Sequence, residues 1–134
     1  MSDQIPAANI IPQFSSMASF TTLDPKNIVG TVGIVGRVAA KYLPAKKNKN
    51  TKLFVAHIQI FDGILVVKAF GAEAYYLNSI LNMGEVVHFM GLKLRNIYDA
   101  TEEDVYERSN IPYEFHYNKY QSYVRCFNKN EHDK

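Results

Sequence analysis

The stretch KLFVAHIQIFDGILVVKAF, residues 52–70, decides the fold of this chain. Two runs rich in β-branched and aromatic side chains flank Asp62 and Gly63. An Asp-Gly pair is typical of a two-residue type I′ hairpin turn, in which both residues have positive φ. We therefore predict two antiparallel strands, over residues 52–61 and 64–70, joined by this turn.

The expected turn also fixes which residues face each other across the hairpin. Phe61 lies opposite Ile64, and counting back from the turn places Val55 opposite Phe70. Because side chains alternate along a strand, one face of the hairpin is apolar and is predicted to be core. That face carries Phe54, Ala56, Ile58, Ile60, Leu65, Val67 and Ala69.

The other face of the hairpin mixes aromatic, basic and hydrogen-bonding side chains. An exposed Phe70 beside Lys68 is unfavourable for solubility but suits a flat, anionic ligand. Single-stranded nucleic acid meets both conditions, because its bases stack on aromatic rings and its phosphates attract lysine. The alternative is that another part of the chain covers Phe70. This second face carries Val55, His57, Gln59, Phe61, Val66, Lys68 and Phe70.

The rest of the chain supplies three more predicted strands and one helix. The first strand is long and glycine-rich, so we expect it to bend, with a bulge at Gly33 or Gly36. Five strands with a helix between the third and the fourth is the order of a small Greek-key barrel, the OB-fold, so the predicted fold class is all-β. The three strands and the helix cover, in turn, residues 28–43, 84–96, 113–117 and 72–82.

The chain is expected to form one domain. With 134 residues, 47% of them apolar and 21% charged, it has room for a single core. Residues 1–26 are predicted to be an N-terminal arm, residues 27–127 the OB-fold domain, and residues 128–134 a polar tail. Aromatic residues spaced three and four apart between Tyr117 and Phe127 indicate a C-terminal helix or arm within this domain. No stretch resembles a secretory signal or a membrane span, which predicts a soluble, intracellular protein without a membrane partner.

Charged residues are segregated along the chain, although the formal net charge is only +2. The segment 37–52 carries basic residues without an acid, and the segment 99–107 carries acids without a base. The basic segment is expected to attract nucleic acid; the alternative is that both segments are solvated loops. The basic residues are Arg37, Lys41, Lys46, Lys47, Lys49 and Lys52.

The sequence shows only weak signals for disulfide, metal, phosphate-loop or catalytic sites. The single Cys126 has no partner for a disulfide, and the four histidines lack the paired spacing of a zinc site. The sequence GTVGIVG, residues 30–36, lies within a strand pattern and lacks the Lys-Ser/Thr of a phosphate-binding loop. No carboxylate pair or nucleophile–base set stands out. We therefore expect no enzyme activity, no metal and no cofactor.

Several segments carry a family resemblance. TKLFVAHIQIFDGILVVKAFGAEA, residues 51–74, LNMGEVVHFMGLKL, residues 81–94, and YEFHY, residues 113–117, resemble the DNA-binding OB-folds of the replication protein A large subunit. NIVGTVGIVGRVAAKYL, residues 27–43, and MGEVVHFMGLKLRNIY, residues 83–98, resemble the first OB-fold of the telomere end-binding, or protection-of-telomeres, family. The narrower resemblance implies a nuclear protein that binds single-stranded telomeric DNA at chromosome ends, with other telomere proteins as partners.

The resemblance implies roles for particular residues. Phe70 matches the strand-three aromatic that stacks a base in both families, and Lys93 matches a strand-four lysine at the ligand. Tyr42 matches a first-loop tyrosine of the telomeric pattern, and Tyr98 lies one residue from the place of an aromatic in a later loop. Gly91 stands where the telomeric pattern often has a basic residue. A side chain that would help to recognise the DNA sequence is therefore absent here.

The predicted interface is a groove that runs from the basic segment across Phe70 to the strand containing Lys93 and Arg95. Side chains alternate along a strand, so Lys93 and Arg95 point to one face and Leu92 and Leu94 to the other. If the leucines are buried, both cations are exposed. Four phosphate contacts would give a slope of log K against log salt of about −3. The candidate nucleic-acid-binding residues are Phe70, Lys68, Lys93, Arg95, Tyr42, Lys41, His57, Gln59, Lys46, Lys47 and Tyr98.

Three other functions stay open at the level of sequence. A general single-strand binder of the replication protein A type would use the same stacking surface without sequence preference. A protein-interaction OB-fold would use Phe61 and Phe70 to hold a peptide or a partner subunit. RNA is a further possible ligand, because nothing in the sequence reports on the 2′-hydroxyl.

Overall fold

The computed structural model describes residues 12–21, 31–43, 52–96 and 113–127. Most of these residues lie in β-strands, so the predicted predominance of β-structure is confirmed. No helix among the described residues is long and apolar enough to cross a membrane. The elements are α1 (Ala18–Thr21), β1 (Val32–Tyr42), β2 (Leu53–Ile60), β3 (Gly63–Phe70), α2 (Ala72–Ile80), β4 (Val86–Asn96), β5 (Tyr113–His116) and β6 (Tyr123–Phe127).

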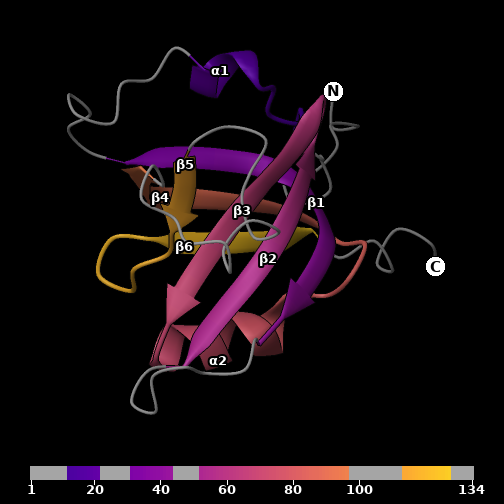
Figure 1. Cartoon of the computed structure of the whole chain (residues 1–134). Coiled ribbons are helices and arrows are strands. Elements are labelled where there is room, and N and C mark those ends of the chain that lie inside the picture. Colours follow the sequence, from indigo (N-terminus) through magenta and orange to yellow (C-terminus); the bar gives the residue numbers. More distant parts are fainter. Residues whose placement is uncertain (1–11, 22–30, 44–51, 97–112, 128–134) are drawn as a thin grey trace, which may run out of the picture.

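Five of the strands close into a ring. The order is β1-β2-β3-β5-β4, and β4 pairs again with β1. All neighbours in the ring are antiparallel except β3 and β5, which run parallel. The helices α1 and α2 lie at opposite ends of this ring (Figure 1).

The long strand β1 closes the ring because it bends twice. Its pairing with β4 shifts register between Val32 and Ile34, and its pairing with β2 shifts between Val38 and Ala40. The first shift confirms the predicted bulge at Gly33. Gly36 has a different role, since a Cβ there would lie 2.5 Å from the carbonyl oxygen of Gln59.

The core face expected for the hairpin is confirmed. Each of its seven side chains is at most 2% exposed, and burying one such aliphatic or aromatic side chain contributes roughly 1.5–3 kcal/mol. The other elements add further buried side chains to the same cluster. These include Ile34, Val38, Leu77, Phe89, Leu92 and Phe115.

The hairpin register differs from the predicted one by two residues. Ile60 pairs with Gly63 and Val55 pairs with Lys68, so Phe61 and Asp62 form the turn. Neither Asp62 nor Gly63 has positive φ, and the predicted type I′ turn is therefore wrong. A shift of two residues leaves every side chain on its expected face, because the strand period is two.

The N-terminal segment explains the altered turn. The backbone N–H of Phe61 donates to the carbonyl of Ser15 at 2.8 Å, and the N–H of Met17 donates to Oδ1 of Asp62 at 2.7 Å. The Met17 side chain also fills the space where a Cβ of Gly63 would lie. These tertiary contacts outweigh the local preference of the Asp-Gly pair.

Residues 12–21, which belong to the predicted N-terminal arm, consequently pack against the ring of strands. Ser15 pairs with Val35 in both directions: its N–H donates to the Val35 carbonyl, and its Oγ accepts from the Val35 N–H, both at 2.9 Å. Phe20, in α1, is buried, and its ring lies 5.5 Å from that of Phe115.

The C-terminal segment, predicted to be a helix or an arm, forms a strand, β6 (Tyr123–Phe127). Strand β6 pairs antiparallel with β4, from Val86 opposite Phe127 to Met90 opposite Tyr123. A turn before β6 is closed by the N–H of Ser122, which donates to the carbonyl of Asn118 at 2.7 Å. Tyr123 and Phe127 therefore lie at the two ends of β6, while Tyr117 and Tyr120 precede it, and the four do not form one helical face.

Candidate nucleic-acid interface

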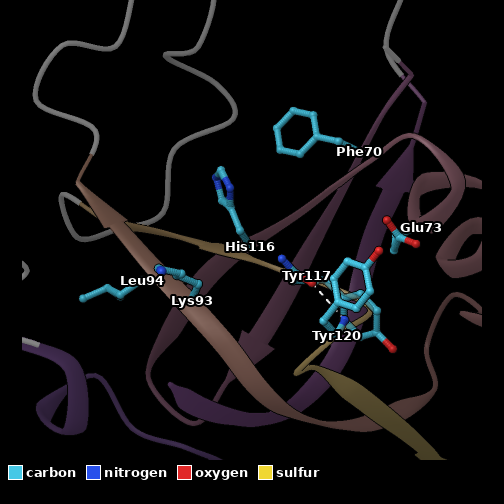
Figure 2. Close-up of a pocket in the computed structure, with 8 residues that line it drawn as sticks. Phe70, Glu73, Lys93, Leu94, His116, Tyr117 and Tyr120 are labelled. Atoms are coloured by element: carbon cyan, nitrogen blue, oxygen red, sulfur yellow. Dashed lines mark hydrogen bonds between the residues drawn. The ribbon is translucent and has the colours of Figure 1, made fainter. Parts of the chain in front are cut away.

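A surface pocket of about 360 Å³ lies where β3 ends. Phe70 comes from β3, Glu73 from α2, Lys93 from β4 and His116 from β5, with Asn118 and Tyr120 from the turn that follows (Figure 2). The volume is within the usual range for small-ligand pockets, roughly 300–1,000 Å³. Four separate elements thus bring an aromatic ring, a cation and an anion to one site.

Phe70 forms an apolar wall of this pocket. Its side chain is 38% exposed, as expected for a stacking residue, and its ring lies 5.3 Å from the ring of His116 at a tilt of 53°. A base cannot enter between these rings, because that would require a separation of about 7 Å, twice the carbon contact distance. A base can stack only on the outer face of Phe70.

Lys68 does not reach solvent, and its expected exposure is wrong. The side chain is 7% exposed, and Nζ lies 2.9 Å from Oε2 of Glu114. Glu114 lies on β5, next to His116, whose backbone pairs with that of Lys68. Because the Lys68 charge is compensated inside the protein, we do not assign it a phosphate contact.

Glu114 also positions the aromatic wall. Its Oε1 accepts a hydrogen bond from Nε2 of His116 at 2.8 Å, and His116 in turn packs against Phe70. Burial by itself raises the pKa of Glu114, but the hydrogen bonds from His116 and Lys68 and their charges outweigh it and lower the pKa below its ordinary value of 4.5. Glu114 is therefore an anion at neutral pH and holds the His116 ring in one orientation.

A row of aligned residues crosses all five strands of the ring at this level. Tyr42 pairs with Val55, Val55 with Lys68, Lys68 with His116, and His116 with Lys93. Neighbouring strands lie about 4.8 Å apart, so the row extends over about 19 Å. The row joins Tyr42 to the pocket through backbone pairing, with the buried side chains of Val55 and Lys68 between them, and the predicted groove stays a prediction.

The other predicted site residues occupy different environments. Gln59 and Lys93 are exposed, whereas His57 is half-buried, with Nε2 3.5 Å from the hydroxyl of Tyr42. Lys41 lies between strand and helix, and its Nζ donates to the carbonyl of Asn78 at 2.7 Å. Val55 and Val66, which were expected on the open face, are fully buried.

Part of the predicted interface lies outside the described residues. This applies to Lys46, Lys47 and Tyr98, to the acidic segment 99–107, and to the side chain of Arg95, whose backbone pairs with Glu114. Their predicted contribution stays a prediction.

Sequence reasoning missed Glu73, Glu114, His116, Asn118 and Tyr120. The segment YEFHY contained a usable signal, because Tyr113 and Phe115 share one parity and Glu114 and His116 the other. Two polar side chains on the outer face of a strand next to β3 would have indicated partners for Lys68. Glu73 and the turn residues have no comparable signal in the sequence.

Two further features lie apart from this pocket. Among the described residues, no group of three or more His, Cys, Asp or Glu side chains could hold a metal ion. A second pocket, of about 330 Å³, is lined by Phe14, Phe61 and nearby serines at the other end of the hairpin. At about 3.3 Å per residue, β3 separates Phe61 from Phe70 by about 25 Å. These two phenylalanines therefore do not share a pocket.

Comparison of the sequence with models of known protein families finds no match, and no curated protein matches it. The structure is similar to solved structures, including a chain from "Structure and Conformational Change of a Replication Protein A Heterotrimer Bound to ssDNA". That match has a TM-score of 0.59 at 14% sequence identity, and it covers 80% of this chain and 24% of that chain. The two chains share a fold. This supports the resemblance to replication protein A, while the telomeric resemblance stays a prediction.

Proposed function

We propose that this chain is an OB-fold module, a Greek-key barrel, that binds single-stranded DNA and has no catalytic activity of its own. The observation that carries the proposal is the exposed Phe70 ring, held by His116 beside Lys93 on a closed ring of strands. Stacking provides about 1–3 kcal/mol per base without sequence preference. The shared fold with a chain of replication protein A, solved bound to ssDNA, supports this assignment.

The DNA path in this proposal runs over the row of residues across the ring and uses its exposed and half-buried members, not the buried Val55 and Lys68. One base stacks on the outer face of Phe70, and the phosphates next to it lie near Lys93. The strand continues toward Tyr42 and His57, which form an edge-on ring pair 5.8 Å apart. OB-folds bind oligonucleotides across this kind of surface, with about 4–16 nucleotides per fold.

The finer form of the proposal is that the DNA is a G-containing telomeric overhang and that the protein acts in the nucleus, at chromosome ends. Its support is the sequence resemblance of residues 27–43 and 83–98. The general, replication protein A-like function is the second candidate, and the shared fold favours it. The two differ in whether base order matters.

A fluorescence-polarisation competition assay separates these possibilities. A labelled telomeric repeat is displaced by the same repeat, by a scrambled strand of equal composition, and by duplex DNA. The telomeric form predicts that the repeat competes at least tenfold better than the scrambled strand, and equal competition would leave the general form. Failure of every single strand to bind would overturn the proposed function. Strands with blocked and free 3′ ends, added to the same series, report end preference.

A further inference from the structure

Glu73 is an unexpected residue in a pocket that receives DNA. It lies in the first turn of α2, and among the described residues its carboxylate has no hydrogen bond or ion pair. An anion cannot favour a phosphate, because like charges repel. If DNA occupies the pocket, the carboxylate must face a base.

The polar groups of the pocket are arranged by sign. Glu73 and Lys93 lie on opposite sides of the pocket, and the Phe70 ring lies away from the line between them (Figure 2). Lys93 is exposed and has no hydrogen bond or ion pair among the described residues. Glu73 lines the same pocket as Phe70, so a base that stacks on Phe70 at this pocket would meet acceptor oxygens on the Glu73 side.

Only guanine matches this arrangement. A carboxylate has two acceptor oxygens and can receive two parallel hydrogen bonds. The N1–H and N2–H₂ groups of guanine are adjacent donors, while O6 and N7 are acceptors at the other edge. Adenine, cytosine and thymine each place a ring nitrogen or carbonyl acceptor next to their donor, and the carboxylate would repel it.

We propose that this pocket is a guanine-reading subsite, in which Glu73 accepts hydrogen bonds from N1–H and N2–H₂ of a guanine that stacks on Phe70, while Lys93 stays with the neighbouring phosphate. The inference rests on the proposed binding of single-stranded DNA. It adds specificity for one base to a surface whose stacking is indifferent to base identity.

A simpler role for Glu73 exists. A carboxylate in the first turn of a helix is stabilised by the helix dipole, whatever else it contacts. That role makes no distinction between bases, so the test must measure base discrimination and not affinity alone.

The test compares single-stranded dT oligonucleotides that carry one central guanine, hypoxanthine or adenine, by fluorescence polarisation. Hypoxanthine lacks only the N2 amino group of guanine. A lost hydrogen bond to a charged group corresponds to about a tenfold or greater loss of affinity. We expect the native protein to prefer guanine over hypoxanthine by about tenfold and over adenine by more.

The discrimination should depend on Glu73. In Glu73→Gln, the preference for guanine over hypoxanthine should fall to threefold or less, while Glu85→Gln, which removes a carboxylate outside the pocket, should leave it unchanged. Glu73→Ala provides a second variant, and circular dichroism verifies that each is folded.

The outcomes separate the two proposals. Equal binding of guanine and hypoxanthine by the native protein, or an unchanged preference in both Glu73 variants, would overturn the guanine subsite alone. Absence of binding to all of the oligonucleotides would overturn the proposed function together with it.

Discussion

Phe70 ends β3 with a partly exposed ring, so its contribution to DNA binding can be isolated by substitution. Phe70→Ala should weaken single-strand binding about 5- to 150-fold, the equivalent of about 1–3 kcal/mol for one stacked base. Phe61→Ala is the matched control, since Phe61 is 78% exposed at the other end of the hairpin. Fluorescence polarisation with one labelled oligonucleotide measures both. Equal losses in the two variants would contradict the assignment of the Phe70 surface.

The buried pair of Lys68 and Glu114 should be costly to break. In Glu114→Ala, the Lys68 charge loses its partner, and we expect the free energy of unfolding in urea to fall by about 3–5 kcal/mol. A double substitution, Lys68→Met with Glu114→Leu, removes both charges and should recover most of this loss. A double variant as unstable as Glu114→Ala would show that the charge pair is not the cause.

The same carboxylate predicts a pH dependence. Because the pKa of Glu114 in the folded protein lies below its ordinary value of 4.5, its ionised form stabilises the native state above that value. This stability is lost as the pH falls below 4.5 through the folded pKa. Urea unfolding between about pH 6 and pH 3.5 should therefore show the advantage of the native protein over Glu114→Gln shrinking in the acid range. A constant difference would contradict it.

At the residue scale, sequence predicted the face of a side chain better than its surroundings. Which hairpin side chains face the core follows from the two-residue period of a strand alone. This alternation placed the core residues inside and Phe70 outside, as observed. Lys68 shares the parity of Phe70, but its partner Glu114 comes from β5, which is distant in sequence and reaches β3 through parallel pairing. The alternation in YEFHY offers Glu114 and His116 as candidate partners, but no local pattern shows that β5 lies beside β3, so the burial of Lys68 could not be derived.

At the scale of elements, packing between strands decides features that local preference cannot. Gly91 interrupts the basic pattern of the telomeric resemblance, and the structure gives a steric reason: its φ is +73°, and a Cβ there would lie 2.0 Å from the carbonyl oxygen of Gln121. The hydroxyl of Ser122 donates to the Gly91 carbonyl at 2.6 Å. The turn before β6 thus occupies the place where a basic side chain would begin.

This close approach predicts an unusually large effect of Gly91→Ala. Positive φ alone costs a non-glycine residue about 1–2 kcal/mol, and overpacking adds about 1–3 kcal/mol. Gly84→Ala is the control, because Gly84 has φ +82° but open space around its Cα. Thermal or urea unfolding should therefore show Gly91→Ala as the more destabilised variant. Similar losses in the two would mean that the turn moves aside without cost.

At the scale of the whole molecule, the closed ring matters because it aligns residues from five strands that are scattered along the sequence. The row from Tyr42 to Lys93 joins positions 42, 55, 68, 116 and 93. The approximate bounds of the five ring strands follow from local patterns, but β6 and the parallel pairing of β3 with β5 depend on long-range packing. The sequence could therefore predict the faces of the strands but not which cations are buried, as Lys68 is.

The small net charge of +2 makes binding depend on local cations and not on the field of the whole protein. Excluding Lys68 reduces the expected phosphate contacts from four to three, which changes the predicted slope of log K against log salt from about −3 to about −2. Lys93→Gln should reduce the magnitude of this slope by about 0.7. Arg125→Gln also removes one positive charge, but from β6, which pairs with the other half of β4, and should leave the slope unchanged. Polarisation titrations over a series of salt concentrations measure these slopes. Equal changes of slope in Lys93→Gln and Arg125→Gln would mean that general charge, and not the Lys93 contact, determines binding.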